Sequence, residues 1–108
     1  SPAVVAVSGK LYAIGGYGGG RLKTVEAFNP QTGAWSAVAP MATARSAAGA
    51  AVLDGKIYIA GGFDGGSINS LNSMEVYDPA TNAWTAAAPM ATARGGFGMA
   101  ALGGKIYA

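Results

Sequence analysis

The ionisable side chains of this 108-residue chain are few, and their types narrow the chemistry that they could perform. The sequence has five acidic residues, seven basic residues, no histidine and no cysteine. It therefore lacks the commonest acid–base group near neutral pH, thiolate metal ligands and disulfides. Asp54 and Asp78 lie in turn sequences, and Glu26 and Glu75 recur at a fixed spacing, so only Asp64 is a carboxylate in a variable segment. One carboxylate is not an acid–base pair, and we predict that the chain alone is not an enzyme.

The glycine-rich stretches raise the question of phosphate binding. The first, "GKLYAIGGYGGGRLK", runs from residue 9 to residue 23. A phosphate loop needs a following helix whose N-terminus faces the anion, and neither G-x-G-x-x-G nor G-x-x-x-x-G-K-[ST] occurs here. A strand is expected after these glycines instead. We interpret them as backbone positions that need positive φ and close chain approach at the end of a strand.

The same stretch recurs along the chain, which identifies a repeat protein. "GKLYAIGGY" at residues 9–17 returns as "GKIYIAGGF" at residues 55–63, and "APMATAR" occurs unchanged at 39–45 and 88–94. Trp35 and Trp84 are 49 residues apart. A period near 50 residues is typical of solenoids, propellers and arrays. The two units differ in length only in the segment after the double glycine, which indicates a surface loop there.

Each period is predicted to hold four short strands and no helix. In the second unit we expect strands A to D at residues 47–53, 56–60, 73–77 and 83–87. Asp-Gly and Asp-Pro-x-x-Asn turns join A to B and C to D as hairpins. Four antiparallel strands connected in order form one blade of a β-propeller. The expected fold class is therefore all-β, with about two and a half propeller blades.

The spacing of the repeated residues resembles the kelch repeat over essentially the whole chain. This resemblance divides the chain into repeat 1 at residues 1–45, repeat 2 at 46–94 and the A–B strands of a third repeat at 95–108. Kelch repeats share a double glycine after strand B, an aromatic residue in strand C, a tryptophan at the start of strand D and an arginine before the next strand A. In this sequence these structural residues are Gly15, Gly16, Phe28, Trp35, Arg45, Gly61, Gly62, Tyr77, Trp84 and Arg94.

Two of these residue types have alternative interpretations. The tryptophans could form a carbohydrate-stacking surface, but packing between twisted sheets is favoured because they recur opposite aromatic residues. Arg45 and Arg94 could bind a ligand, but a bond to a neighbouring backbone or to Glu26 and Glu75 is favoured because repeat-invariant residues usually serve the repeat.

The resemblance also implies a binding face, since the B–C and D–A loops of kelch propellers share one face around the central channel. Kelch propellers commonly bind peptides or other ligands on that face. The family pattern places contact residues directly after the double glycine and directly after the repeat arginine; the second of these is Gly95 in repeat 2, which has no side chain. Tyr17 and Phe63 could instead only shield the double glycine. The candidate ligand-binding residues are Tyr17, Arg21, Ser46, Phe63, Asp64, Ser67 and Asn69.

Three functions are compatible with this organisation. The first is a protein- or peptide-binding or scaffolding module, the second is a structural self-assembling unit, and the third is part of a carbohydrate-active enzyme similar to sialic-acid mutarotases. Kelch-type copper oxidases need histidines and a cysteine-crosslinked tyrosine, so this segment cannot supply such a site, and we expect no cofactor and no metal. The net charge of +2 without a basic run argues against nucleic acid, and no apolar run reaches the ~20 residues of a membrane span.

The blade count also predicts partners. Propellers close with ~4–8 blades, so two and a half blades leave apolar faces that would exceed the few hundred Å² usual for a monomer. We expect these faces to be covered by further kelch repeats of the same chain or by copies of the chain.

Overall fold

The structure is a computed structural model that describes residues 1–18, 20–64 and 70–108. These residues form ten β-strands and no helix, so no helix among them could cross a membrane. The predicted all-β class is confirmed. The strands are β1 (Ala3–Val7), β2 (Lys10–Ile14), β3 (Val25–Asn29), β4 (Ala34–Val38), β5 (Gly49–Leu53), β6 (Lys56–Ala60), β7 (Met74–Asp78), β8 (Ala83–Ala87), β9 (Ala100–Leu102) and β10 (Lys105–Tyr107).

The strands pair as two four-stranded antiparallel sheets and one hairpin. The first sheet has the order β1-β2-β3-β4, the second β5-β6-β7-β8, and β9 pairs with β10. Two-residue turns join the first strands of each sheet, and both turn residues have positive φ, 52° and 74° at Asp54 and Gly55. Such turns match the right-handed twist of antiparallel strands. Each sheet is therefore one propeller blade, as the turn sequences predicted.

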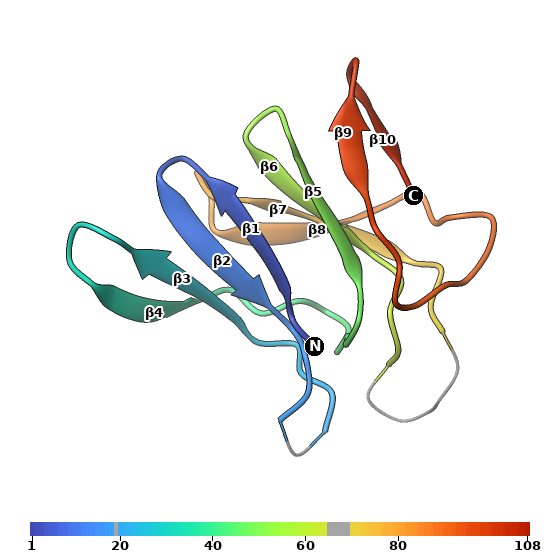
Figure 1. The fold of residues 1–108 in the computed structure, drawn as a ribbon, viewed down its shortest axis with the longest axis horizontal. Helices are drawn as coiled ribbons and strands as arrows, with labels where there is room; N and C mark the ends of the chain where they lie inside the picture. The colour runs from blue at the N-terminus through green and yellow to red at the C-terminus, as the bar shows by residue number, and fades with distance from the viewer. Residues whose placement is uncertain (19, 65–69) are drawn as a thin grey trace.

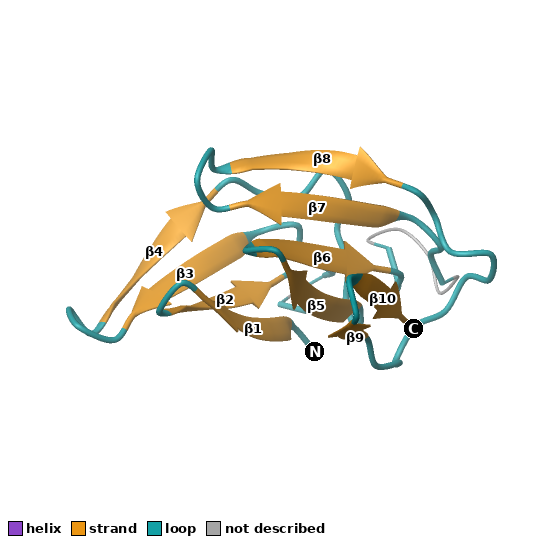
Figure 2. Cartoon of the chain, turned by 90° about the horizontal axis from the view of Figure 1, so that it is seen from above, coloured by secondary structure: helices purple, strands orange, loops and turns teal. Residues whose placement is uncertain are grey.

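The sheets lie side by side along their first strands. β1 contacts β5, and β5 contacts β9 (Figure 1). Figure 2 shows the two large sheets spreading apart from these inner strands toward the outer strands β4 and β8. The core is sandwiched between the blades and contains Ile14 and Val25 from the first sheet and Ile57, Ile59 and Tyr77 from the second.

Strand A of the second blade starts later than expected. We predicted it from residue 47, but β5 begins at Gly49 because Ala47 has a φ of 54°, which does not fit an extended strand. β7 is likewise displaced by one residue and begins at Met74. The predicted strands B and D agree with β6 and β8.

The double glycines allow the chain to pass close to the end of strand B. Gly61 has a φ of 66°, and a Cβ there would lie 2.4 Å from the carbonyl oxygen of Arg94. Gly15 shows the same distance to the carbonyl oxygen of Arg45. The next glycine in each pair then donates a backbone hydrogen bond to the same carbonyl, over 2.9 Å from Gly62 to Arg94. The double glycine of each blade thus contacts the backbone of the segment that follows strand D of the same blade and leads to the next blade.

Candidate functional site

Four of the predicted ligand-binding residues meet where the first two blades join. Arg21 donates from Nε to Ser46 Oγ over 3.3 Å. Its guanidinium carbon lies 5.9 Å from the ring centroids of both Tyr17 and Phe63. An arginine between two aromatic faces is held by the attraction of its charge to the rings, at about 0.5–1 kcal/mol for each exposed contact. We call these four residues the loop cluster.

Backbone pairing places the loop cluster. The backbone amides of Ser46 and Phe63 each donate to the carbonyl of the other, over 3.0 and 2.9 Å. This bridge ties the D–A loop of the first blade to the residue after the double glycine of the second blade. On the other side, an antiparallel bridge pairs Tyr17 with Arg21 and closes their short loop. The cluster is therefore built from three loop segments whose backbones are held by isolated β-bridges.

The loop cluster is open to solvent on one side. Tyr17 is 66% exposed, whereas Ser46 is 6% exposed beneath the arginine. Arg21 and Phe63 are half-buried. An arginine side chain has five N–H donors, and its bond to Ser46 uses one of them. The arrangement can present a positively charged, planar donor group flanked by aromatic surface.

The remaining candidates differ in their surroundings. Asp64 follows Phe63, is half-buried and has an interaction partner in the chain. Ser67 and Asn69 lie outside the described residues. A Cβ at Gly95 would lie 2.7 Å from the ring of Phe63, so this ring covers the glycine. A serine at this position, as in the first blade, would require the ring of Phe63 to shift.

Arg45 forms a second polar centre at the same blade junction, and it is buried. The side chain is 1% exposed and pairs with Glu75 of the second blade, with Nη2 and Oε2 3.0 Å apart. Nη1 donates to the carbonyls of Gly61 and Ser73 over 3.0 and 2.9 Å, and Nη2 also donates to Ser73 Oγ over 2.9 Å. Every nitrogen of this guanidinium that can donate does so, because Nε bonds Glu75 as well. Arg45 thus joins two blades and has no surface left for a ligand.

We expected the side chains of both repeat arginines to bond a backbone group or a carboxylate, but among the described residues the side chain of Arg94 does neither. It is exposed, and its guanidinium carbon lies 5.9 Å from the ring centroid of Phe97. The reason is topological, since Arg45 reaches strand C of the following blade. Only strands A and B follow Arg94 in this chain. Glu26, the counterpart of Glu75, is exposed on the first sheet.

The two tryptophans are also unequal. Trp84 is half-buried, donates from Nε1 to the carbonyl of Ala39 over 2.7 Å and packs at a tilt against Tyr77 with ring centroids 5.0 Å apart. Trp35 packs at a tilt against Phe28, with ring centroids 5.1 Å apart, but is 51% exposed. The expected packing between sheets therefore holds for Trp84 alone, because no described residue of another blade covers Trp35.

Tyr77 is a further polar residue at this junction. Its hydroxyl lies 2.7 Å from Asn82 Oδ1. Burial raises the pKa of Tyr77 above its ordinary value, and the nearby Tyr12 and Asp78 add to the effect. Among the residues that the structure describes, no group of histidine, cysteine and acidic side chains could hold a metal ion.

Two consecutive four-stranded meanders, joined through glycine pairs and a buried arginine, define blades of a β-propeller. A family model described as the Kelch motif matches residues 1–42 and 44–91. The chain belongs to the kelch family.

Relatives of known name are similar over part of the chain. The influenza virus NS1A-binding protein of Homo sapiens is 48% identical over 62 residues, which are 56% of this chain and 10% of that protein. Kelch-like protein 35 of Mus musculus is 38% identical over 68 residues, 62% of this chain and 12% of that protein. The matched segments thus span about a tenth of the length of these relatives.

A solved structure shares the fold. A fungal alcohol oxidase in complex with copper superimposes with a TM-score of 0.75 at 24% identity, over 86% of this chain and 23% of the oxidase chain. At this identity the likeness concerns the fold alone. The chain itself has no histidine and no cysteine.

Proposed function

We propose that this chain is a protein- or peptide-binding module whose binding face is built from the B–C and D–A loops. The observation that carries the proposal is the loop cluster, in which Tyr17, Ser46 and Phe63 contact the guanidinium of Arg21. The similarity to an NS1A-binding protein and to kelch-like proteins supports a role in binding. The cluster is exposed on one side, as a binding surface must be.

The chemistry of the loop cluster favours an extended peptide with an acidic side chain. A carboxylate accepts two parallel hydrogen bonds from an arginine, and such bonds are stronger than those between neutral groups. Tyr17 and Phe63 offer flat apolar surface for the neighbouring residues of the peptide. Aromatic and arginine side chains are also the types that contribute most to protein interfaces.

An enzymatic role is less favoured by the same residues. A mutarotase-like reaction needs groups that exchange protons with the sugar, and the loop cluster holds a permanently charged arginine, one serine and one tyrosine. Asp64 is the carboxylate nearest in sequence to the cluster. Screening for mutarotase and oxidase turnover tests this alternative, and turnover abolished by Asp64→Ala would establish it in place of the binding role.

Selection from a random peptide library tests the binding proposal directly. We expect the 108-residue chain to select peptides enriched in Asp and Glu. Arg21→Ala and Phe63→Ala should each weaken the best peptide by at least about tenfold, the effect of a ~1.4 kcal/mol contact. Lys23→Ala is the matched control, because Lys23 is an exposed cation two residues from Arg21 and outside the cluster.

Two results would contradict the proposal. One is a set of selected peptides without acidic enrichment. The other is a peptide that binds Arg21→Ala as tightly as the unsubstituted chain. Thermal melting of each variant shows whether a loss of binding reflects a loss of folding.

A further inference from the structure

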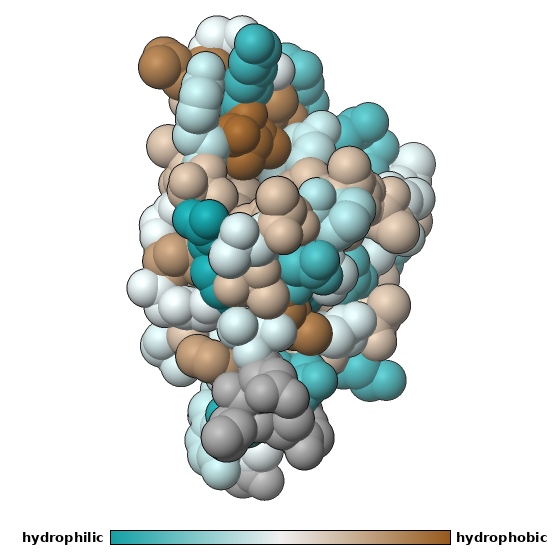
Figure 3. All heavy atoms as spheres, turned by 90° about the vertical axis from the view of Figure 1, so that its right-hand side faces the viewer, coloured by the Kyte–Doolittle hydropathy of each residue, from teal (hydrophilic) through white to brown (hydrophobic). Residues whose placement is uncertain are grey.

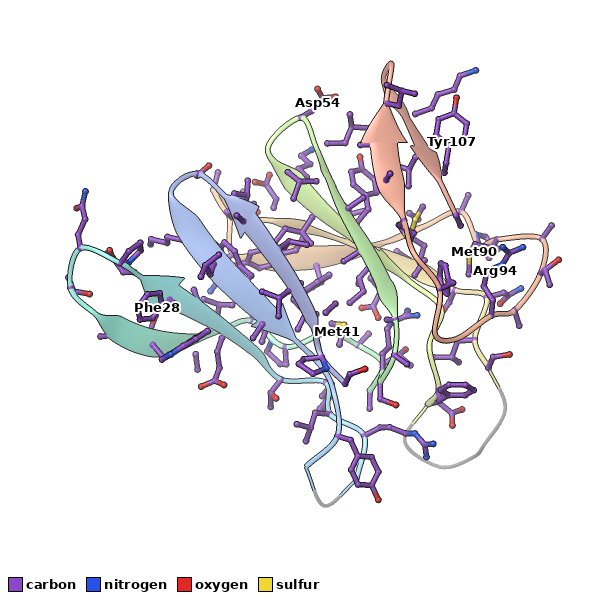
Figure 4. All side chains as sticks on the ribbon, viewed as in Figure 1. Phe28, Met41, Asp54, Met90, Arg94 and Tyr107 are labelled. Atoms are coloured by element: carbon purple, nitrogen blue, oxygen red, sulfur yellow. The ribbon has the colours of Figure 1, made fainter. Side chains whose placement is uncertain are left out.

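One aromatic ring of the loop cluster lies against a glycine of the next blade boundary. Phe63 directly follows the double glycine of the second blade. Gly95 directly follows Arg94, which is labelled in Figure 4 on the connection from β8 to β9. A Cβ built on Gly95 would lie 2.7 Å from both Cε2 and Cζ of the Phe63 ring and 3.1 Å from its Cδ2. The ring therefore occupies the space that a side chain at Gly95 would need.

The backbone of Gly95 does not itself require glycine. Its φ lies outside the left-handed region, unlike the φ of 66° at Gly96, so an alanine could adopt the same backbone without strain. Figure 3 shows the side of the molecule that carries this connection, and pale colours of intermediate hydropathy, as expected for alanine, threonine and glycine, prevail in the middle of that face. Contact with the Phe63 ring is thus what distinguishes this position from Gly98, which has no positive φ either but would place its Cβ in open space.

A side chain at Gly95 would move the ring of Phe63 and leave its backbone in place. The backbone of Phe63 exchanges two hydrogen bonds with Ser46 and is bridged to Ser70 on the other side. Ring atoms at 2.7 Å must retreat to the 3.4 Å at which ordinary contact begins, a shift of about 0.7 Å. These atoms form the far end of the side chain, so changes in its torsion angles can provide the shift.

Such a shift alters the surroundings of the Arg21 guanidinium. Its carbon lies 5.9 Å from the centroid of the Phe63 ring, close to the ~6 Å limit of the attraction between a cation and an aromatic face. A displaced ring either leaves this range or crowds the guanidinium. Both results impair a donor group that must be bordered by aromatic surface and still be open to a ligand.

We propose that Gly95 is a positioning residue of the loop cluster, which seats the Phe63 ring beside Arg21 and thereby sets the affinity for an acidic ligand. The inference rests on the proposed binding function. The position after the repeat arginine then acts in two ways, because Ser46 bonds Arg21 directly and Gly95 acts through the ring. Binding at the boundary of the first two blades depends, in this way, on a residue of the following boundary.

A first experiment observes the ring position without any ligand. The Nε–H signal of Arg21 is followed by ¹H–¹⁵N NMR of the 108-residue chain and identified by its loss in Arg21→Lys. This signal reports on the ring, because aromatic rings shift the resonances of nearby protons. Gly95→Ala should move the signal, and Gly98→Ala, the matched control in the same connection, should leave it in place. An unchanged Arg21 signal in Gly95→Ala overturns the proposal.

A second experiment measures the affinity. The probe is the strongest acidic peptide selected by the unsubstituted chain, labelled with fluorescein and followed by fluorescence anisotropy. Gly95→Ala should weaken its binding about tenfold, as Phe63→Ala does, because either change removes the ring from its place. Gly98→Ala should bind within about twofold of the unsubstituted chain. Equal binding to Gly95→Ala and the unsubstituted chain overturns the proposal.

A double substitution separates positioning from a general effect on folding. In Phe63→Ala the ring is absent, so adding Gly95→Ala should weaken binding by less than about twofold, whereas independent residues would give about a further tenfold loss. An additive loss overturns the proposal. A chain that binds no acidic peptide overturns it together with the proposed function, and the NMR comparison then still shows whether Gly95 positions the ring.

Discussion

Replacing Glu75 by glutamine is the sharpest test of how the blades are held together. The carboxylate is the only counter-charge that the described residues provide to the Arg45 guanidinium, which is 1% exposed. Glutamine keeps the shape and one acceptor oxygen but removes the charge. Breaking a buried pair in this way costs 3–5 kcal/mol, and the retained acceptor places our expectation at about 3 kcal/mol.

The repeat itself provides the control. Glu26 is the same residue type at the same place in its sheet, but it is exposed and no ion pair with a described residue is present. In dilute protein Glu26→Gln should change the free energy of unfolding by less than about 0.5 kcal/mol. The comparison therefore holds the residue type and the position in the blade constant and changes the burial and the ion pair.

Urea unfolding followed by tryptophan fluorescence measures both variants. A loss of ~3 kcal/mol is a large part of the ~5–15 kcal/mol that stabilises an ordinary domain. It should lower the melting temperature by roughly 10–25 °C in a chain of this size. Repeating the measurement at several protein concentrations separates stability from self-association. Equal losses for the two variants, or a loss below 1 kcal/mol for Glu75→Gln, would refute the assignment of Arg45 and Glu75 as the junction.

Three further predictions concern packing, backbone and pH. Trp84→Ala should destabilise the chain by about 3 kcal/mol, because it removes a half-buried ring and its hydrogen bond, whereas Trp35→Ala should cost about 1 kcal/mol. Chemical denaturation measures both losses, and equal losses would contradict the unequal burial of the two rings. Gly61→Ala places a Cβ 2.4 Å from a carbonyl oxygen at a residue with positive φ, and should lower the free energy of unfolding by at least ~2 kcal/mol. Gly103→Ala also has positive φ but meets open space, and should lower it by ~1 kcal/mol. Thermal melting compares the two variants, and the reverse order would contradict this reasoning. The raised pKa of Tyr77 means that the unfolded chain ionises first, so its contribution is present below the ordinary pKa of about 10 and is lost as pH rises through the folded value. Unfolding curves between pH 9 and 12 should show this loss, and Tyr77→Phe should reduce it; an unchanged slope would refute the assignment.

Turn chemistry explains why much of the fold could be predicted from sequence. Asp-Gly and Asp-Pro-x-x-Asn fix where a strand must stop, and the predicted strands B and D of the second blade agree with β6 and β8. Strand A has no such marker at its start. The positive φ of Ala47 prevents the strand from starting before β5. Alanine rarely adopts this left-handed conformation, so the residue type gave no reason to predict it.

Spacing alone could not identify the partner of a repeated residue. Arg45 lies between Glu26 and Glu75 in the sequence, and the repeat offers both as partners. In the structure Arg45 pairs with Glu75 of the next blade, because the segment that carries Arg45 leads from β4 to β5. The same ambiguity affects the tryptophans, because Trp84 is covered by the segment that arrives from the preceding blade and bonds the carbonyl of Ala39.

The four residues of the loop cluster were among seven candidates from the sequence, but their arrangement could not be predicted. The pattern of the repeat placed Tyr17, Ser46 and Phe63 on one face, and Arg21 was added as a variable loop residue. Contact between Arg21 and a residue 25 positions later depends on how two blades stack, which no local signal encodes.

The two polar centres of the junction are coupled by adjacency in the chain. Arg45 is buried between the blades, and the next residue, Ser46, pairs its backbone with Phe63 and accepts the bond from Arg21. Two neighbouring residues of one segment thus belong to the buried junction and to the loop cluster. At the second boundary Arg94 is followed by Gly95, which has no hydroxyl and lies under the ring of Phe63. A paired arginine and a hydroxyl residue directly after it are separate features, and among the described residues only the boundary between the first two blades has both.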